Sequence, residues 1–398
     1  MPRTTRSIRR ATIAGACAAA AILAGACSSS HDHAAAAAAA ADSTAVAAAP
    51  APAAPARPDF TPPAIKHVFV IVLENQGYTT TFGAASPAPY LADTMVKAGA
   101  LLRQYYGTGH YSLDNYIAMV AGIAPDSATQ ADCGRYEDFR QTGTAADGQP
   151  IGNGCVYPAS VPTIANQLMA KQLTWKGYME DMGNDPTREP ATCGHPPLNT
   201  ADMTHAAKPN DQYATKHDPF VYFHAIIDSA FCHTNVVPLT RLAADLRSAA
   251  STPNFSYIVP SLCHDGHDHP CASKEPGGLV SADRFLRQWV PRITHSPAFR
   301  DGGLLIVTFD EALASDASAC CNEPTGPNTR APGVTGPGGG RTGAVLLSSF
   351  ITPGTVSDVP YNHYSLLRSI EDIFGLGYLG YAGQAGLVSF GADVYTAK

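Results

Sequence analysis

Two apolar runs of the chain each end in side chains that carry oxygen donors. Glu74 and Asn75 directly follow the first run, and Asp310 and Glu311 directly follow the second. Carboxylate and amide oxygens are the ligands that hard divalent cations prefer in proteins. Carboxylates crowded into one place would repel each other unless a cation lay between them. The pattern predicts a site for calcium, magnesium, manganese or zinc, although such residues also occur as simple caps of turns.

The apolar runs themselves predict the strands that position these side chains. Residues 67–73 and 302–309 are rich in β-branched and aromatic side chains, which is typical of strands buried in the middle of a parallel sheet. Open α/β sheets bind their ligands at the carboxyl ends of such strands. We therefore expect both sets of oxygen donors at one edge of a mostly parallel sheet. Further strands are predicted at 175–181, 254–262 and 344–350, and helices at 113–122, 161–175, 238–249 and 361–380.

A serine lies where the next helix should begin. Gly107 and Gly109 permit tight turns, and apolar residues fall at helical spacing from Leu113 onward, so Ser112 is expected at or just before a helix N-terminus. The free N–H groups and the helix dipole there would favour an alkoxide and a bound phosphoryl oxygen. Serine is also a common N-cap without any chemistry. Its position alone therefore leaves both roles open.

Histidines and aspartates cluster after the strand predicted at 254–262. Three histidines and two aspartates fall within seven positions there, between two cysteines. Side chains in this cluster that could reach a metal or a phosphate are Asp265, His267, Asp268 and His269. Another histidine, His363, begins the last predicted helix, where it could donate a proton, bind metal, or simply cap or pack.

The N-terminus has the order of a secretory signal over residues 1–26. Four arginines precede an uncharged run from Ala11 to Ala26, which is too short to span a bilayer. Cleavage before Cys27 would match a bacterial lipobox and tether the protein to a membrane by lipid, whereas ordinary cleavage nearby would release it. We expect an exported protein: a cell-envelope lipoprotein, or a periplasmic or extracellular protein. Residues 27–63, rich in Ala and Pro, predict an extended linker before one folded domain, 64–398.

The charge balance excludes some classes of partner. The chain has a formal net charge of −7, and removal of the four leader arginines would make it −11. Such a balance argues against nucleic acid or an anionic membrane surface as a general partner. An anionic substrate would therefore need local positive charge, which a bound cation could supply.

Eight cysteines remain after the leader, and an even number in an exported chain predicts disulfides. The segment between Met182 and Asp218 reads as a long excursion over the active edge, and a disulfide there would favour an ordered lid. The pairs that are close in sequence are Cys133 with Cys155, Cys193 with Cys232, and Cys263 with Cys271. Cys320 and Cys321 are adjacent, so they either bridge each other or pair elsewhere.

Four stretches in order resemble a known family: VFVIVLENQGY, GHYSLDNYIAMVAG, VTFDEA and NHYSLLRSIEDIFGL. Together they resemble the bacterial and fungal phosphoesterases that include acid phosphatases and phospholipases C, a branch of the alkaline-phosphatase superfamily. The resemblance spans about Ile65 to Gly380. It implies a three-layer α/β/α sandwich of the alkaline-phosphatase type and metal-assisted phosphoryl transfer in the 64–398 domain.

The resemblance also implies roles for individual residues. The metal ligands would be Glu74, Asn75, Asp310 and Glu311. The nucleophile would be Ser112, which would pass through a phosphoserine intermediate. Residues expected to hold phosphate or assist proton transfer are His110, Asn115, His267 and His363.

Two features depart from the family pattern. Gly77, Tyr78 and Thr79 stand where the family usually continues with a Ser-Phe-Asp-like sequence, so any role of that carboxylate is missing. The chain also ends soon after the last block, without the extra C-terminal domains of large phospholipases C. We therefore expect a metal-dependent phosphomonoesterase of the acid-phosphatase kind, acting on a small phosphate ester.

Two alternatives remain open, and a third lacks the motif that it needs. The first is a phosphodiesterase of the phospholipase C type, which would need an apolar entrance, suggested only by Met182 and Met203. The second is a surface binding module without activity. A sulfatase would need a CxPxR-type motif, and the sequence contains none.

Overall fold

An eight-stranded sheet runs through the middle of the protein in the computed structural model, which describes residues 60–397. The strand order is β13-β2-β12-β11-β1-β10-β7-β9. Only β12 is antiparallel to its neighbours within this sheet, and the other neighbouring pairs are parallel. The strands are β1 (His67–Leu73), β2 (Ala100–Leu102), β7 (Trp175–Met179), β9 (Val236–Pro238), β10 (Phe255–Val259), β11 (Gly303–Phe309), β12 (Ala344–Ser348) and β13 (Thr355–Ser357). The mostly parallel sheet that the sequence predicts is confirmed.

Strand β1 lies near the centre of the sheet and is buried along its whole length. Because side chains alternate across a strand, its residues enter two separate hydrophobic cores. Val68, Val70 and Val72 belong to one core, and Phe69, Ile71 and Leu73 belong to the other. Each such side chain stabilises the fold by about 1.5–3 kcal/mol relative to an exposed one. Both faces of the sheet must therefore be covered.

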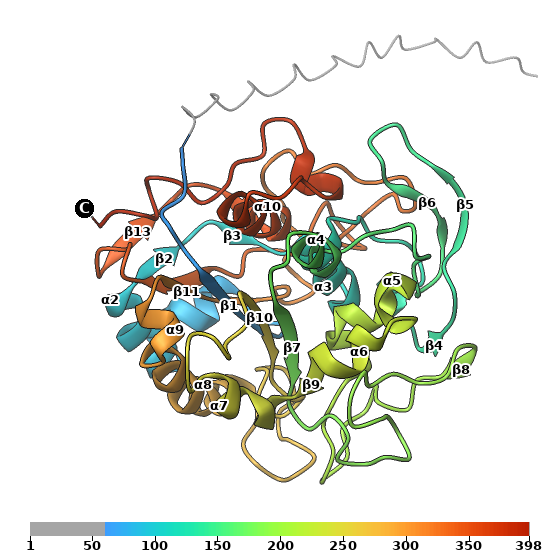
Figure 1. Ribbon diagram of the computed structural model, residues 1–398, viewed down its shortest axis with the longest axis horizontal. Helices are drawn as coiled ribbons and strands as arrows, with labels where there is room; N and C mark the ends of the chain where they lie inside the picture. Colours follow the sequence, from blue (N-terminus) through green and yellow to red (C-terminus); the bar gives the residue numbers. More distant parts are fainter. Residues whose placement is uncertain (1–59, 398) are drawn as a thin grey trace, which may run out of the picture. The chain divides into compact units, whose positions relative to one another are not determined.

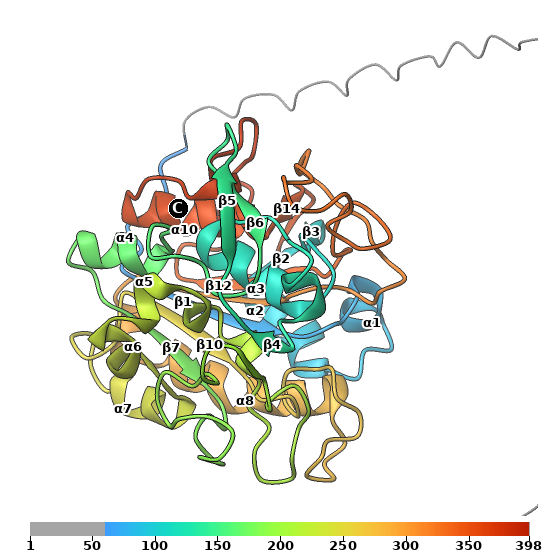
Figure 2. The same ribbon diagram turned by 90° about the vertical axis from the view of Figure 1, so that its right-hand side faces the viewer.

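Helices cover both faces, which makes a three-layer α/β/α sandwich (Figures 1 and 2). The first core holds side chains of α3 (Ser112–Ala121), α4 (Ile164–Ala170), α5 (His224–Ile227) and α10 (His363–Phe374). The second holds side chains of η1 (Tyr90–Met95), α7 (Leu242–Asp245), α8 (Gly278–Thr294) and α9 (Pro297–Arg300). Shorter helices are α1 (Tyr78–Phe82), α2 (Val96–Ala98) and α6 (Ala230–Asn235).

One predicted helix is much shorter than the sequence suggests. The segment 238–249 forms a short 3-10 turn, η5 (Leu239–Arg241), followed by the single turn of α7. The hydroxyls of Ser251 and Thr252 donate to the Asp245 carbonyl, which removes that carbonyl from the helical ladder. Side-chain hydroxyls that compete for backbone groups in this way end helices.

Several elements that the sequence did not predict are present. Among them are α8, the longest helix of the described residues, and a hairpin of β5 (Arg140–Thr144) and β6 (Pro150–Asn153). Small two-stranded pairs also join β3 (Tyr105–Tyr106) to β14 (Tyr361–Asn362) and β4 (Arg135–Tyr136) to β8 (Thr200–Ala201). These elements lie outside the central sheet.

All eight cysteines of the described residues form disulfides. The pairs are Cys133–Cys155, Cys193–Cys232, Cys263–Cys271 and the adjacent Cys320–Cys321. The three pairings predicted from proximity in sequence are confirmed, and the fourth is the vicinal bridge. The predicted signal peptide (1–26), the lipidation site Cys27 and most of the predicted linker (27–63) lie outside the described residues.

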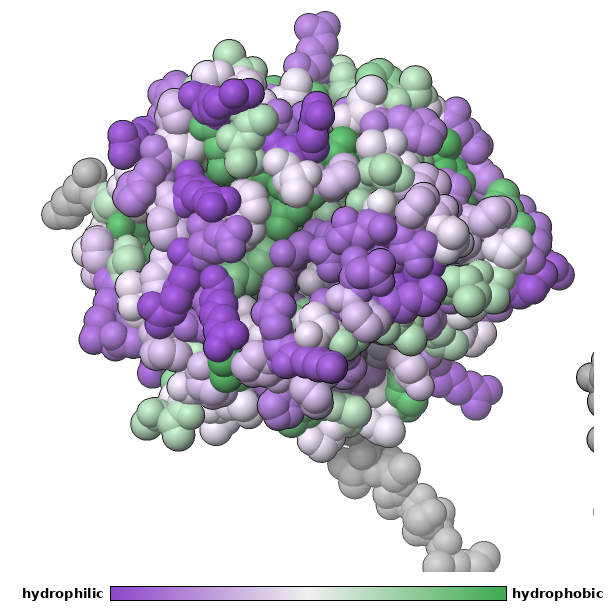
Figure 3. Space-filling view, turned by 90° about the horizontal axis from the view of Figure 1, so that it is seen from below, coloured by the Kyte–Doolittle hydropathy of each residue, from purple (hydrophilic) through white to green (hydrophobic). Residues whose placement is uncertain are grey.

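Within residues 60–397, no helix combines the length and hydrophobicity needed to cross a bilayer. The face seen from below is coloured mainly as hydrophilic, with hydrophobic residues interspersed (Figure 3). The apolar side chains of this part of the chain serve mainly the two cores on either side of the sheet.

The long segment between β7 and η4 (Pro219–Tyr222) is irregular but tied together by a buried arginine. Arg188 donates to the Asp211 carboxylate and carbonyl at 2.8 and 2.7 Å, and both side chains are almost fully buried. It also donates to the carbonyls of Met203 and Ala206. A buried charge with all of these partners is well satisfied. The segment is therefore ordered and ends in the 3-10 turn η3 (Thr215–His217).

Candidate active site

The first pair of predicted oxygen donors meets the second at one edge of the sheet. Leu73 and Phe309 are paired in register at the ends of the parallel strands β1 and β11, so Glu74 and Asp310 follow side by side. The Asn75 N–H donates to Asp310 Oδ1 at 2.9 Å. Glu74 and Asp310 are completely buried. The structure thus brings the two motifs together at the carboxyl ends of the central strands.

Burial and mutual repulsion dominate the electrostatics of these carboxylates. Burial raises the pKa of Asp310 well above its usual range, and the neighbouring charges of Glu74 and Glu311 raise it further. Burial also raises the pKa of Glu311. Glu74 Oε1 and Asp310 Oδ2 are buried without a hydrogen-bond partner. A site of this kind is costly unless a positive charge enters it.

The donor set fits a divalent cation. Asn75 Nδ2 donates to Glu74 Oε2 at 2.7 Å, which leaves the Asn75 amide oxygen as its donor atom toward a ligand. Together with the unpartnered oxygens of Glu74 and Asp310, it offers hard oxygen ligands. Elsewhere in residues 60–397, one compact group of ligand atoms joins Cys263, His264 and Glu275. Because Cys263 is in a disulfide, that group lacks a thiolate and does not fit a metal as well.

The acidic residues lead to a pH prediction for protein held in a chelator. Burial raises the pKa of Asp310 and Asp265 well above their usual range, and of Asp218 and Glu371 to about 8. The folded state therefore keeps protons that the unfolded state releases above about pH 4, so the free energy of unfolding falls as the pH rises. His363 opposes this trend only below its usual pKa of 6.5, since burial lowers its pKa to about 4.

We expect the thermal midpoint in chelator to be about 5 °C lower at pH 8 than at pH 5. Calorimetry across this range checks the expectation. A midpoint that rises with pH would show that the buried carboxyl groups do not dominate the stability.

Ser112 is the first residue of α3 and lies against the acidic pair. Its Oγ donates to Glu74 Oε2 at 2.8 Å, and the side chain is buried. The preceding residue, Tyr111, has a φ of 80°, in the left-handed region that a non-glycine residue rarely adopts. Such strain persists only where the surroundings enforce it, and it is frequent at functional sites. The serine hydroxyl is thus held at a helix N-terminus and is hydrogen-bonded to the buried carboxylate of Glu74.

Asn115 holds the turn that precedes Ser112. Its Oδ1 accepts from the N–H groups of Thr108 and Gly109 at 2.8 and 3.0 Å. Its Nδ2 donates to the carbonyls of Gly109 and Tyr111. Both ends of the amide are therefore engaged with the backbone. This geometry favours a role in positioning Ser112 over direct contact with phosphate.

His110 is buried between two acceptors. Nδ1 makes a close ion pair with Glu311 Oε2, and Nε2 lies 3.0 Å from the Asp316 carbonyl. A ring that faces two acceptors carries protons on both nitrogens. Burial opposes the charged form, but the contact with Glu311 raises the pKa of His110 overall. His110 thus acts as a buried cation that holds Glu311 in place.

His363 also has both nitrogens engaged, but as a neutral ring. Nε2 donates to the Asp310 carbonyl, and Nδ1 lies 3.0 Å from the Tyr105 hydroxyl, which burial keeps protonated. Burial lowers the pKa of His363 to about 4. This arrangement favours a role in fixing the backbone of Asp310 over proton transfer.

His267 lies at the rim of the site with half of its side chain exposed. Its backbone N–H donates to Asp265 Oδ1 at 2.9 Å, which fixes the loop after β10. The contact with Asp268 raises the pKa of His267, and the charge of Glu74 adds to this effect. His267 thus combines a raised pKa with access to solvent.

Two functional candidates, Lys216 and His217, were missed in the sequence. Both belong to η3 at the end of the long segment. Lys216 Nζ donates to Asp132 Oδ2 at 2.8 Å, and Asp132 Oδ1 accepts from the Leu113 N–H in the first turn of α3. Burial opposes its charge, but Asp132, Glu74 and Asp310 raise the pKa of Lys216 above its usual value. A positive charge is therefore held beside the start of α3.

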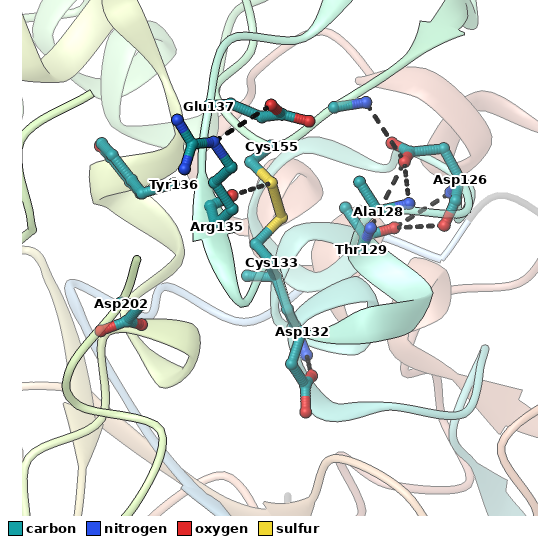
Figure 4. The surroundings of a disulfide bond; sticks show 12 residues. Asp126, Ala128, Thr129, Asp132, Cys133, Arg135, Tyr136, Glu137, Cys155 and Asp202 are labelled. Atoms are coloured by element: carbon teal, nitrogen blue, oxygen red, sulfur yellow. Dashed lines mark hydrogen bonds and ion pairs between the residues drawn. A yellow bond between two sulfur atoms is a disulfide. The ribbon is translucent and has the colours of Figure 1, made fainter. Parts of the chain in front are cut away.

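Asp132 is itself anchored by a disulfide. It directly precedes Cys133, which is bonded to Cys155 (Figure 4). Nearby, Asp126 accepts from the N–H groups of Ala128 and Thr129 (Figure 4). It also accepts from the Tyr157 hydroxyl. The disulfide and these bonds fix the loop that carries Asp132 against the N-terminus of α3.

Comparison with known proteins finds a match to the model of the phosphoesterase family over residues 85–377. The chain is 24% identical to a phosphatidylinositol-3-phosphatase of Mycobacterium tuberculosis over 81% of each chain. It is 25% identical to a phosphate-repressible acid phosphatase of Penicillium chrysogenum, over 72% of this chain and 54% of that one. A solved protein of the alkaline phosphatase superfamily from Vibrio parahaemolyticus matches 80% of this chain and 70% of its own, with 14% identity and a TM-score of 0.45.

Proposed function

Since the chain belongs to the phosphoesterase family, as its match over residues 85–377 shows, we propose that it is an exported, metal-dependent phosphomonoesterase of the acid-phosphatase kind. It is a phosphoric ester hydrolase. The observation that carries the proposal is the contact of Ser112 Oγ with Glu74 Oε2 at 2.8 Å, at a helix N-terminus beside buried carboxylates. Export rests on the leader sequence.

Ser112 is the nucleophile in this proposal. Its Oγ attacks phosphorus as its proton passes to Glu74; the Oγ–P bond forms and the ester P–O bond breaks. His267, at the rim and with its pKa raised by the contact with Asp268, protonates the leaving alkoxide. Water then attacks phosphorus and gives a proton to His267, the P–Oγ bond breaks, and the proton held by Glu74 returns to Ser112 Oγ as phosphate leaves.

A divalent cation held by Glu74, Asn75, Asp310 and Glu311 would favour the serine alkoxide and offset the charge of the phosphoryl oxygens. His110 and His363 support this set, the first through the Glu311 side chain and the second through the Asp310 carbonyl. Asn115 fixes the turn before the nucleophile. In this proposal, each predicted site residue therefore acts on the substrate, holds the cation, or orients a residue that does.

Lys216 supplies positive charge for an anionic substrate. Changing Lys216 to methionine should raise KM for a phosphate ester about tenfold, a loss of about 1.4 kcal/mol of binding, with a smaller effect on kcat. Steady-state kinetics measures both. Lys176→Met is the control for the loss of an ion pair. Lys176 lies at the start of β7, away from the site, and pairs with Asp245 at 2.6 Å in a similarly buried contact. Equal KM values for the two variants would show that Lys216 does not contribute to substrate binding.

A second candidate is a phosphodiesterase of the phospholipase C type. Such an enzyme needs an apolar entrance. Of the two residues expected to form it, Met203 is exposed but Met182 is buried in the core. One relative is named a phosphatidylinositol-3-phosphatase. A phosphatidylinositol phosphate, which is a lipid monoester, is therefore a further substrate to test. These points favour monoester cleavage.

The deciding experiment compares a chromogenic phosphomonoester with the matching phosphocholine diester. The protein is first treated with chelator, and calcium, magnesium, manganese or zinc is added back separately. Monoester cleavage that requires a metal and Ser112 supports the proposal. Preference for the diester would instead support a phospholipase C, and inactivity toward both substrates in folded, metal-loaded protein would support a binding module.

A further inference from the structure

A buried histidine beside the proposed metal site has no hydrogen-bond partner. His217 is 2% exposed, and its ring stacks on Tyr116 with a centroid distance of 5.1 Å and an interplanar angle of 8°. Nε2 lies 3.2 Å from Glu74 Oε1, and Nδ1 lies 3.8 Å from Asp265 Oδ2. All four of these atoms are buried and unpartnered. Buried polar atoms in this state need an explanation.

A neutral imidazole cannot donate to both carboxylates when both are ionised, as they are at a pH where a cation binds them. It has one N–H and one lone pair, so one nitrogen can donate while the other faces a carboxylate oxygen, lone pair against lone pair. A cation shared by Nε2 and Glu74 Oε1 would remove this conflict. The remaining Nδ1–H would then face Asp265, which is the arrangement that metal-bound histidines usually adopt with a carboxylate behind them.

We propose that His217 is a nitrogen ligand of the metal centre, bound through Nε2, and that Asp265 orients it through Nδ1. The inference rests on the proposed metal dependence and adds a ligand from the long segment between β7 and η4. An imidazole ligand shifts preference from the hard ions calcium and magnesium toward first-row transition ions such as zinc. The proposed ligand set therefore favours a transition ion over calcium and magnesium.

One packing contact and an ion pair earlier in the segment fix the position of His217. The ring stacks on Tyr116, a buried residue of α3, and the Arg188–Asp211 pair orders the segment that leads to η3. A ligand fixed by stacking loses little conformational freedom when an ion binds. The side chain is therefore preorganised toward Glu74.

The test is metal binding, measured by titration calorimetry on chelator-treated full chain without substrate. We expect wild-type protein to bind zinc at least about tenfold more tightly than magnesium or calcium. His217→Gln should lower zinc affinity by about 30-fold or more and change magnesium affinity much less, since glutamine offers an oxygen donor. Asp265→Asn should lower zinc affinity by about 10- to 100-fold.

The matched control is His195→Gln. His195 is a half-buried histidine of the same segment that also stacks on a tyrosine, Tyr136, but bonds to the Pro196 carbonyl. Its loss should leave the affinity for every ion unchanged. Substitution of cobalt gives a second readout, because loss of a nitrogen ligand should alter the visible absorption of the bound ion.

Wild-type zinc affinity in His217→Gln, with an unchanged cobalt spectrum, would overturn the inference while leaving the proposed function intact. Wild-type protein that binds no divalent ion would overturn both. If His217→Gln does not fold, Asp265→Asn decides, since it retains the ring and removes only its carboxylate partner.

Discussion

Replacing Ser112 by alanine is expected to lower the turnover of a phosphomonoester about a thousandfold or more. The change removes the oxygen that would bond to phosphorus. It should cost little stability, because the Ser112 hydroxyl does not cap α3 and Glu74 Oε2 keeps its contact with Asn75 Nδ2. Rapid quenching of the wild-type reaction should in addition trap a protein heavier by one phosphoryl group, mapped to Ser112.

A buried serine in the central sheet, Ser256, provides the control. Ser256 lies in β10 with its hydroxyl buried and unpartnered, so Ser256→Ala should retain full turnover and stability. Retention of more than a few per cent of wild-type turnover by Ser112→Ala would exclude the covalent route. A direct attack by water would then have to be considered, with Ser112 only orienting Glu74.

The positions where the central strands end, and with them Glu74 and Asp310, could be predicted from the sequence because local patterns determine them. An apolar run that stops at a carboxylate marks both the strand and its end, as at Glu74 and Asp310. Parallel pairing of β1 with β11 then follows from the fold type, and it brings the two residues together. Here short-range signals were sufficient.

Lys216 and His217 could not be found in this way. They stand in an irregular segment whose path depends on Arg188, Asp211 and a disulfide, which are all tertiary contacts. The only signal in the sequence was the unusual length of a segment predicted to lie over the active edge. Likewise, the protonation of His110 depends on Glu311, which is 201 residues away.

Helix α8 is different, because its signal was present. Its buried residues recur at helical spacing, from Leu279 through Phe285 and Leu286 to Ile293. An amphipathic pattern of this length predicts a helix without any tertiary information. The shortening of the helix predicted at 238–249 depended instead on how the Ser251 and Thr252 hydroxyls are oriented. That orientation is fixed only in the folded chain.

Changing Asp310 to asparagine is expected to lower turnover but to raise the stability of the metal-free protein. Turnover should fall about a thousandfold, because one of the proposed metal ligands loses its charge. In chelator near pH 7, however, the free energy of unfolding should rise by about 1–2 kcal/mol. In the variant, the amide oxygen can still accept from the Asn75 and Glu311 N–H groups. The amide nitrogen takes the place of the unpartnered Oδ2 and can donate to Glu74.

Addition of metal should reverse the order of stability, since only wild-type protein gains the full free energy of binding. Thermal denaturation with and without metal measures both states. Glu371→Gln is the matched control: burial raises the pKa of Glu371 to about 8 in α10, so its loss should change stability equally with and without metal and leave turnover intact. If Asp310→Asn were less stable than wild type even in chelator, repulsion among the buried carboxylates would not be the reason that this site needs a cation. Such a result would leave Asp310 as a structural acceptor for two N–H groups.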